Sequence, residues 1–396
     1  MLGFGRKNGP GARMIDGNAI DELVDWMIDG ARPGSNAQQS FDAIGRRLVG
    51  AGMPIGRFAL FVQTLHPNIA GRRILWTPEE GPSLTEGGID LYSRDGYVKN
   101  PLPTVTSKQV TIRRRLNNPA LISDYPILGE LVAEGFTDYV AQPLIFTSGE
   151  THAVTWSTKH EGGWSEDAIA VLERIRRPLA RLVEAHLLRL NAVSIISAYV
   201  GHDSGEQILQ GRVHRGDGEE IDAAILFTDL IGFAALSNSR TGAEIVSVLN
   251  EAFDIMVPPV EARGGEILKF LGDGFFAIFP YGDRTTLAGA VKAASEAVLE
   301  GEKKLAEAEV GKLLGFRSAI HAGRFHYGNI GGANRLDFTA IGQPVNYAAR
   351  LLAAASDLSQ TRVASATAAG HLCLPPQLVA EVAFKGFGGL QPVYGW

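Results

Sequence analysis

Residues 221–233 read IDAAILFTDLIGF, and this stretch decides the fold of the C-terminal half of the chain. The apolar run Ile225–Phe227 predicts a short buried strand. The strand ends near the carboxylate of Asp229, and Gly232 predicts a turn into a helix. Such a turn places one carboxylate beside several backbone N–H groups, so a metal ion bound there could share a phosphate with them. The alternative is an ordinary strand-end aspartate that caps the next helix.

A second stretch, KFLGDGFFAIFP at residues 269–280, places another carboxylate in a similar setting. Two apolar runs flank Gly272, Asp273 and Gly274, a pattern typical of a β-hairpin with the aspartate at its tip. Turn aspartates are often selected for their backbone preferences, and on these two motifs alone that alternative stays open. The functional interpretation is that Asp273 is a second metal ligand that faces Asp229. Two carboxylates suit Mg²⁺ or Mn²⁺, and phosphate oxygens would complete the coordination of the metal ion.

The third stretch is RLDFTAIGQPVNYAARL at residues 335–351. Together the three stretches resemble the catalytic domain of class III nucleotidyl cyclases, which convert a nucleoside triphosphate into its 3′,5′-cyclic monophosphate and pyrophosphate. The resemblance runs from about Ile221 to the C-terminus, with the motifs in the family's order. It implies an α+β fold at 221–396, a palm-like, ferredoxin-like domain with a mainly antiparallel sheet.

The resemblance also implies a metal and phosphate site. Asp229 and Asp273 would hold two Mg²⁺ (or Mn²⁺) ions per active site. One ion would favour the attacking ribose 3′-alkoxide, and the other would stabilise the pyrophosphate leaving group. The backbone expected to bind phosphate oxygens is that of Leu230, Ile231, Gly232 and Phe233.

Two positions match those with which the family reads the base. Lys269 stands four residues before Asp273, where adenylyl cyclases place the lysine that contacts adenine N1. Thr339 stands seven residues before Asn346, where they place an Asp, Thr or Ser that reads the 6-amino group. A lysine donates to adenine N1, whereas guanine N1 carries a hydrogen and cannot accept. Guanylyl cyclases typically have Glu and a small residue such as Cys here, so the resemblance implies an adenylate cyclase that forms cyclic AMP from ATP.

Asn346 and Arg350 complete the implied catalytic set. Asn346 would orient the ribose, and Arg350, one helical turn later on the same face, would neutralise charge on the α-phosphate. Lys385, in FKGFGG, stands where many members carry a phosphate-binding lysine, although Phe387 is an alternative alignment for that residue. The alternative for each is an ordinary polar surface residue.

The resemblance implies a homodimer whose active sites are shared across the interface. The aspartates would come from one chain, and the base-reading pair with Asn346 and Arg350 from the other. A catalytically weak cyclase-fold signalling module and a guanylate cyclase are the rival interpretations. All six positions are filled here, which opposes the first, and Lys269 with Thr339 opposes the second. A diguanylate cyclase is disfavoured because its signature needs two acidic residues and then Phe, whereas Ile267 and Leu268 follow Glu266 here.

Thr241 and Glu244, which follow the first stretch, have the spacing of a helix capping box. The helix behind them has an apolar stripe that predicts core packing. It is expected to end before Pro258, since proline lacks the N–H that helix interiors need.

Residues 15–184 resemble a GAF-type sensory domain. The resemblance rests on a layout of helices, antiparallel strands and a closing long helix, and on the stretch EGFTDYVAQPL. Residues 77–119 are rich in Pro, Gly and Ser and are predicted to hold long loops. GAF domains bind small ligands such as cyclic nucleotides or tetrapyrroles, or only dimerise, so the resemblance implies either a small-molecule effector or a role in setting the geometry of a dimer. Residues 1–14 are Gly-rich and are predicted to be a flexible tail.

Residues 185–220 are predicted to be a helical linker and connector. The spacing of Leu172, Ile175, Leu179 and Leu182 favours a parallel coiled coil that joins two protomers. The alternative is a helix that lies on its own domain.

Composition sets further limits. No apolar run among the 396 residues is long enough for a membrane span, and no signal peptide opens the chain, so a cytoplasmic location is expected. A net charge of −6 argues against nucleic acid as the main partner. The single cysteine, Cys373, excludes an internal disulfide.

Overall fold

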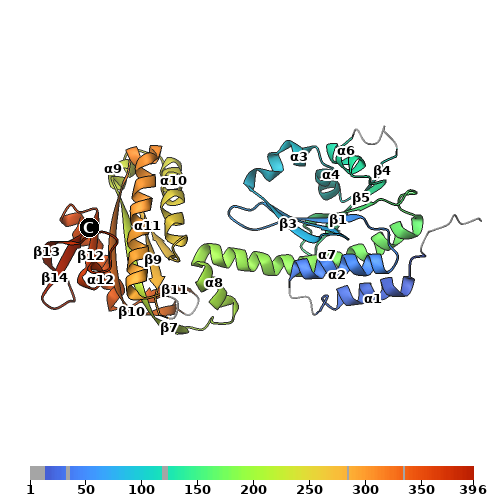
Figure 1. Cartoon of the computed structure of the whole chain (residues 1–396). Coiled ribbons are helices and arrows are strands. Elements are labelled where there is room, and N and C mark those ends of the chain that lie inside the picture. Colours follow the sequence, from blue (N-terminus) through green and yellow to red (C-terminus); the bar gives the residue numbers. More distant parts are fainter. Residues whose placement is uncertain (1–13, 33–35, 118–123, 283–284, 333–334) are drawn as a thin grey trace, which may run out of the picture. The chain divides into compact units, whose positions relative to one another are not determined.

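The computed structural model describes residues 14–32, 36–117, 124–282, 285–332 and 335–396. The predicted tail, apart from its last residue, lies outside these ranges. The chain divides into two compact units, Met1–Ile195 and Ile196–Trp396, which are described separately (Figure 1). Each combines helices with a mainly antiparallel sheet, so the α+β prediction is confirmed. Within the described ranges, no helix has the length and apolar character needed to span a membrane.

The N-terminal unit contains a six-stranded sheet in the order β3-β2-β1-β6-β5-β4, with every neighbouring pair antiparallel. Its strands are β1 (Arg57–Gln63), β2 (Gly71–Thr77), β3 (Gly81–Gly87), β4 (Ile112–Arg115), β5 (Asp138–Ile145) and β6 (Thr151–Thr158). Side chains alternate along a strand, so Phe58 and Leu60 join the apolar core on one face while Phe61 packs on the other. Both faces of this sheet are therefore apolar and need a cover.

Helices supply that cover. They are α1 (Gly17–Ile28), α2 (Ala37–Gly50), α3 (Asp95–Val98), α4 (Pro101–Lys108), α6 (Pro126–Ala133) and α7 (Glu166–Val200). Figure 1 shows α1, α2 and α7 on one side of the sheet and α3, α4 and α6 on the other. The larger core lies under α1, α2 and α7 and includes Trp76, Trp156 and Trp164.

The prediction of long loops at residues 77–119 is wrong. This region contains β3, a 3-10 helix η1 (Ile89–Ser93), α3, α4 and β4. β3 forms a hairpin with β2, in register from Thr77↔Gly81 to Gly71↔Gly87. The Asn100 side chain caps α4, and Pro101 occupies its first turn, a position that favours proline. The Pro and Gly residues thus begin elements instead of breaking them.

The coiled-coil interpretation of α7 is also wrong for the four residues that suggested it. Leu172, Ile175, Leu179 and Leu182 are buried in the core of the N-terminal unit, under α1, α2 and the sheet. A residue already buried against its own unit cannot contact a partner helix. The alternative, a helix lying on its own domain, is the arrangement observed.

The C-terminal unit contains an eight-stranded sheet in the order β13-β14-β12-β10-β7-β9-β8, with β11 paired to β10. Its strands are β7 (Gly218–Ile231), β8 (Glu266–Leu271), β9 (Gly274–Pro280), β10 (Gly315–Gly331), β11 (Leu336–Ile341), β12 (Arg362–Ser365), β13 (Gln377–Ala383) and β14 (Leu390–Gly395). Only β10 and β12 run parallel. The long antiparallel pair β7–β10 forms the centre, in register from Ile231↔Gly315 to Gly218↔Gly328.

Helices lie on both faces of this sheet as well. They are α8 (His202–Leu209), α9 (Phe233–Ser237), α10 (Gly242–Glu261), α11 (Leu287–Glu307), α12 (Gln343–Asp357) and α13 (Ala366–Ala369), with a 3-10 helix η2 (Glu309–Lys312). α10 and α11 lie side by side (Figure 1) and share a core with Leu226 and Phe275. On the other face, Ala348 of α12 joins the core around Ile225 and Phe276.

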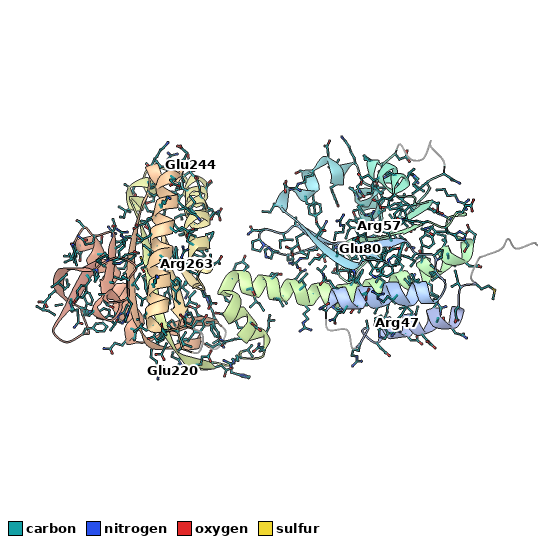
Figure 2. All side chains as sticks on the ribbon, viewed as in Figure 1. Arg47, Arg57, Glu80, Glu220, Glu244 and Arg263 are labelled. Atoms are coloured by element: carbon teal, nitrogen blue, oxygen red, sulfur yellow. The ribbon has the colours of Figure 1, made fainter. Side chains whose placement is uncertain are left out.

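The capping box at the start of α10 is observed, with the Thr241 hydroxyl and the Glu244 carboxylate each accepting the expected N–H. The predicted end of this helix is wrong, because α10 continues through Pro258 and Pro259 to Glu261. Both prolines stand in its last turn, and Pro259 is buried, so packing offsets the missing hydrogen bonds. Glu244 and Arg263 mark the two ends of α10 in Figure 2.

Candidate active site

Asp229 lies near the end of β7, directly opposite Arg317 of β10. The Nη1 atom of Arg317 donates to Oδ2 of Asp229 over 3.1 Å, and its Nε donates to the carbonyl of Gln360 over 3.4 Å. The Asp229 side chain is 34% exposed, whereas that of Arg317 is 14% exposed. A guanidinium fixed from two sides thus lies beside a carboxylate that solvent can still reach.

Asp273 occupies the turn between β8 and β9, and two neighbouring features bring that turn to Asp229. A Cβ at Gly274 would lie 1.9 Å from the carbonyl oxygen of Thr228, so only glycine allows so close an approach to β7. The Thr228 hydroxyl accepts from the N–H of Phe275 over 2.9 Å and donates to its carbonyl over 3.2 Å. One threonine therefore ties the first residues of β9 to the strand that carries Asp229.

The electrostatics of this pair suit a cation. Burial, then the negative charge of Asp273, raises the pKa of Asp229 above its ordinary value, and Arg317 only partly opposes this. The guanidinium of Arg317 contacts only one of the two carboxylates, that of Asp229. The described residues contain no group of three or more His, Cys, Asp or Glu side chains placed to hold a metal ion. A hard cation on Asp229 and Asp273 would take its other oxygens from backbone, water or phosphate.

Arg317 was missed by the sequence analysis. Its position opposite Asp229 depends on the register of β7 with β10, and the two residues are 88 residues apart in sequence. An arginine within the strand sequence FRSAIHAG is the only local signal, and it does not identify Asp229 as the partner.

Lys269 and Thr339 lie in adjoining parts of the unit. The Lys269 ammonium, on β8, forms an ion pair with the carboxylate of Asp337 on β11. Thr339 stands two residues after Asp337 on the same strand, so the two share one face. Lys269 and Asp337 also line a cavity of about 760 Å³, to which residues 197–201 contribute. Asp337 thus contacts the proposed base-reading lysine directly.

Asn346 and Arg350 both lie on the exposed side of α12. In the described part of the chain, neither side chain makes a hydrogen bond or an ion pair. The opposite side of the helix is firmly packed, since the ring of Tyr347 stacks on His321 with centroids 4.4 Å apart. His321 in turn pairs its Nδ1 with the Ser365 hydroxyl over 2.8 Å. The buried side of α12 is thus packed against the sheet, while the predicted catalytic residues Asn346 and Arg350 face solvent.

The remaining predicted residues are placed as follows. Gly232 has φ +94° and begins α9, so the Leu230–Phe233 backbone turns immediately after Asp229. Lys385 is exposed in the connection between β13 and β14. Phe387, its alternative in the alignment, packs edge-on against the ring of Tyr347 at 5.1 Å.

Comparison with known proteins agrees with this geometry. Residues 218–377 match the family described as Adenylate and Guanylate cyclase catalytic domain. The C-terminal unit therefore holds a class III nucleotidyl cyclase catalytic domain. The family match lies outside residues 15–184, whose GAF-like interpretation stays a prediction.

Curated relatives include uncharacterized proteins of Mycobacterium bovis and Mycobacterium tuberculosis, each 31% identical over 198 residues, or 49% of this chain and 33% of the relative. The matched part of the chain thus spans about a third of the length of these relatives.

Similar solved structures include the adenylyl cyclase CyaB from P. aeruginosa, 25% identical with a TM-score of 0.40 over 45% of this chain and 94% of that one. The guanylyl cyclase Cya2 is 25% identical with a TM-score of 0.39 over 45% and 92%. A bacterial light-regulated adenylyl cyclase is 18% identical with a TM-score of 0.46 over 62% and 82%. Cyclases of both base specificities thus stand among these structures.

Proposed function

We propose that this chain is an adenylate cyclase that converts ATP into 3′,5′-cyclic AMP and pyrophosphate. The observation that carries the proposal is the meeting of Asp229 and Asp273 at the end of β7, inside a cyclase catalytic domain. Two carboxylates with one arginine form a site with excess negative charge, which is what a metal–triphosphate substrate requires.

The aspartates and their surroundings would hold the triphosphate. Two Mg²⁺ or Mn²⁺ ions, when bound by Asp229 and Asp273, would activate the ribose 3′-hydroxyl and stabilise the pyrophosphate leaving group. The backbone turn at Leu230–Phe233 would bind phosphate oxygens. Arg317, which contacts Asp229, would add a positive charge near the bound phosphates.

The reaction forms one bond and breaks one. The ribose 3′-oxygen attacks the α-phosphorus and releases its proton to water, while the bond from that phosphorus to the bridging oxygen of the β-phosphate breaks and pyrophosphate leaves. Asn346 would hold the ribose so that the 3′-oxygen lies in line with the leaving group. Arg350 would neutralise the charge that develops on the α-phosphate. Lys385, exposed in its connection, is proposed to bind phosphate from the rim of the site.

Adenine is the proposed base. The Lys269 ammonium has three N–H donors, so it can keep its contact with Asp337 and still donate to adenine N1. Thr339, which lies on the same face of β11 as Asp337, would accept a hydrogen bond from the 6-amino group. Guanine N1 carries a hydrogen and cannot accept from Lys269, which supports ATP over GTP.

The active form is proposed to be a homodimer. Asn346 and Arg350 face solvent in the single chain, and a symmetric pair of chains would turn each set toward the aspartates of the other. Each dimer would then contain two identical shared sites.

Nucleotide turnover tests the reaction. The purified full chain is incubated with ATP or GTP, each with Mg²⁺ or Mn²⁺, and the cyclic nucleotide and pyrophosphate are measured. We expect cyclic AMP and pyrophosphate in equal amounts, with ATP preferred. A preference for GTP would overturn the base assignment, and no turnover under all four conditions would contradict the proposed enzyme.

Mixing two inactive variants tests the shared site. In a heterodimer of Asp229→Ala and Arg350→Ala, one site collects both lesions and the other collects none. Random exchange makes about half of the dimers mixed, so activity should return to roughly a quarter of wild type. If the variants exchange chains and the mixture stays inactive, the aspartates and the arginine belong to one chain.

A further inference from the structure

The N-terminal unit contains a cavity of about 330 Å³ between its sheet and the segment that includes η1, α3 and α4. Phe61, Arg73 and Thr85 stand side by side on β1, β2 and β3 and form part of its floor. In the next row, Gly71 lies opposite Gly87. Two glycines at paired positions let the segment that covers the cavity approach the sheet closely.

Leu91 and Tyr92 of η1 cover the cavity and approach these two glycines closely. A Cβ at Gly71 would lie 2.9 Å from the Tyr92 hydroxyl oxygen, and one at Gly87 would lie 2.6 Å from the Leu91 side chain. The Tyr92 hydroxyl donates to the carbonyl of Ala70 over 2.9 Å, which ties η1 to the sheet. The Tyr92 and Tyr97 rings meet edge to face at 4.9 Å. The space is therefore walled by aromatic rings.

Most charges around this cavity are paired. Arg72 binds Glu86 over 2.7 Å, and Arg94 binds Asp90 over 2.8 Å. Arg73 differs from both, because within the described ranges it forms no ion pair. Its Nη2 donates to the Thr85 hydroxyl over 3.1 Å, whereas its buried Nε has no acceptor.

The surroundings of Arg73 make this lack of a partner costly. Burial, together with the positive charge of Arg57, lowers the pKa of Arg73 below its ordinary value. Arg57 lies on β1 of the same sheet (Figure 2). A partly buried cation with an unused donor and a second cation nearby is unfavourable until an anion reaches it.

We propose that this cavity binds a small aromatic monoanion, with its anionic group on Arg73 and its ring against Phe61, Tyr92 and Tyr97. The volume lies at the lower end of the roughly 300–1,000 Å³ usual for small-molecule sites, which limits the ligand to one or two rings. The residues that define the site all belong to the N-terminal unit, so the inference is independent of the proposed cyclase reaction.

Matched probes test the proposal on the full wild-type chain. Benzoate and 2-naphthoate are titrated against the chain, with benzamide and 2-naphthamide as uncharged counterparts and inorganic phosphate as an anion without a ring. Binding is measured by calorimetry and by the shift in thermal unfolding. We expect the carboxylates to bind at least about tenfold more tightly than the amides, the effect of one charge-assisted contact. Inorganic phosphate alone should bind more weakly than either carboxylate.

Three results on the wild-type chain would overturn the proposal, and none of them depends on the folding of a variant. They are equal affinity for carboxylate and amide, tighter binding of phosphate than of the carboxylates, and no binding by any probe.

A pair of variants locates the site. Arg73→Gln removes the charge and should weaken carboxylate binding at least about tenfold without lowering the unfolding midpoint of the unliganded chain. Arg46→Gln is the matched control, because Arg46 is an exposed arginine of the same unit that pairs with Asp42. Carboxylate binding that survives in Arg73→Gln, or that falls equally in the control, would contradict a site at Arg73.

Discussion

Each unit of this protein contains an aspartate that faces an arginine on the neighbouring strand, and the two pairs are built differently. In the N-terminal unit, Asp138 is fully buried and accepts from Nη2 of Arg113 over 2.8 Å and from the N–H of Trp164 over 3.1 Å. In the C-terminal unit, Asp229 is about one-third exposed and receives a single contact from Arg317, while Asp273 lies beside it.

The difference separates a structural carboxylate from one that is proposed to be functional. The charge of Asp138 is matched by its partners, so a further cation would gain little there. The charge at Asp229 is only partly matched: burial, and then the negative charge of Asp273, raises the pKa of Asp229 above its ordinary value. Unbalanced negative charge at a solvent-accessible site indicates that a cation binds there. A buried carboxylate whose charge is balanced by its neighbours indicates a role in stability.

The largest effect should follow from removing the excess charge. Asp229→Asn and Asp273→Asn should each lower kcat for cyclic AMP formation by about 10³-fold or more, or roughly 4 kcal/mol of transition-state stabilisation. Unfolding should stay unchanged or become harder, since a repulsion is lost. Initial rates and thermal unfolding measure the two effects.

A matched control stands on the same strand pair. Asp222 of β7 lies opposite Arg324 of β10 and binds it over 2.6 Å, at the other end of the strand. Asp222→Asn should leave kcat within about twofold of wild type, since surface ion pairs contribute little. Near-normal rates in both Asp229→Asn and Asp273→Asn would contradict a functional role for these two carboxylates.

The structural half of the comparison predicts a loss of stability. Asp138→Ala leaves the largely buried Arg113 guanidinium with only the Trp164 carbonyl and the exposed Glu166 carboxylate. It also leaves the buried N–H of Trp164 without its acceptor, so the free energy of unfolding of the N-terminal unit should fall by about 3 kcal/mol. Four of the five tryptophans, Trp26, Trp76, Trp156 and Trp164, belong to this unit, so tryptophan fluorescence during urea unfolding measures the change. Asp90→Ala, which breaks an exposed pair with Arg94, should cost much less, since surface ion pairs contribute little. Equal costs for the two variants would contradict the distinction.

A third test uses the buried histidine beneath α12. Burial lowers the pKa of His321 from 6.5 to about 4, so the folded chain disfavours its protonation. The stability that the neutral ring contributes is complete above pH 6.5 and is lost as the pH falls toward 4. The loss should amount to about 3 kcal/mol in the free energy of unfolding of the C-terminal unit.

Urea titrations of the C-terminal unit between pH 7 and 4 compare the wild type with His321→Gln and with His214→Gln, whose side chain is 83% exposed. Only His321→Gln should flatten the dependence on pH. If its profile runs parallel to that of the wild type, His321 does not titrate as its burial predicts.

The smallest effect concerns Asp337. The Lys269–Asp337 pair is partly exposed, so Asp337→Asn should raise KM for ATP only by about two- to fivefold, as expected for a surface pair of up to roughly 1 kcal/mol. As a positioning residue for Lys269, Asp337 should affect KM and the ratio of ATP to GTP turnover more than kcat. A change in kcat alone would place Asp337 outside base recognition.

The sequence predicts the parts of this molecule that local chemistry determines. A strand-end carboxylate and a Gly-Asp-Gly hairpin tip are local signals, and the structure brings Asp229 and Asp273 together as expected. The position of Arg317 depends on a register between distant strands, so no local pattern could reveal it. The spacing of Leu172 and Leu179 identified an apolar helix face but could not tell whether that face meets its own unit or another chain.

Gly274 has a consequence for how such a domain loses activity over evolutionary time. One methyl group at this position would collide with the carbonyl of Thr228 and push the Asp273 turn away from β7. Every charged residue of the site would remain in the chain, yet the two carboxylates would no longer meet. A descendant of this domain that lost the proposed activity in this way would still contain every aspartate, lysine and arginine of the site. The glycine of the hairpin is as informative a marker of a working domain as the charges it brings together.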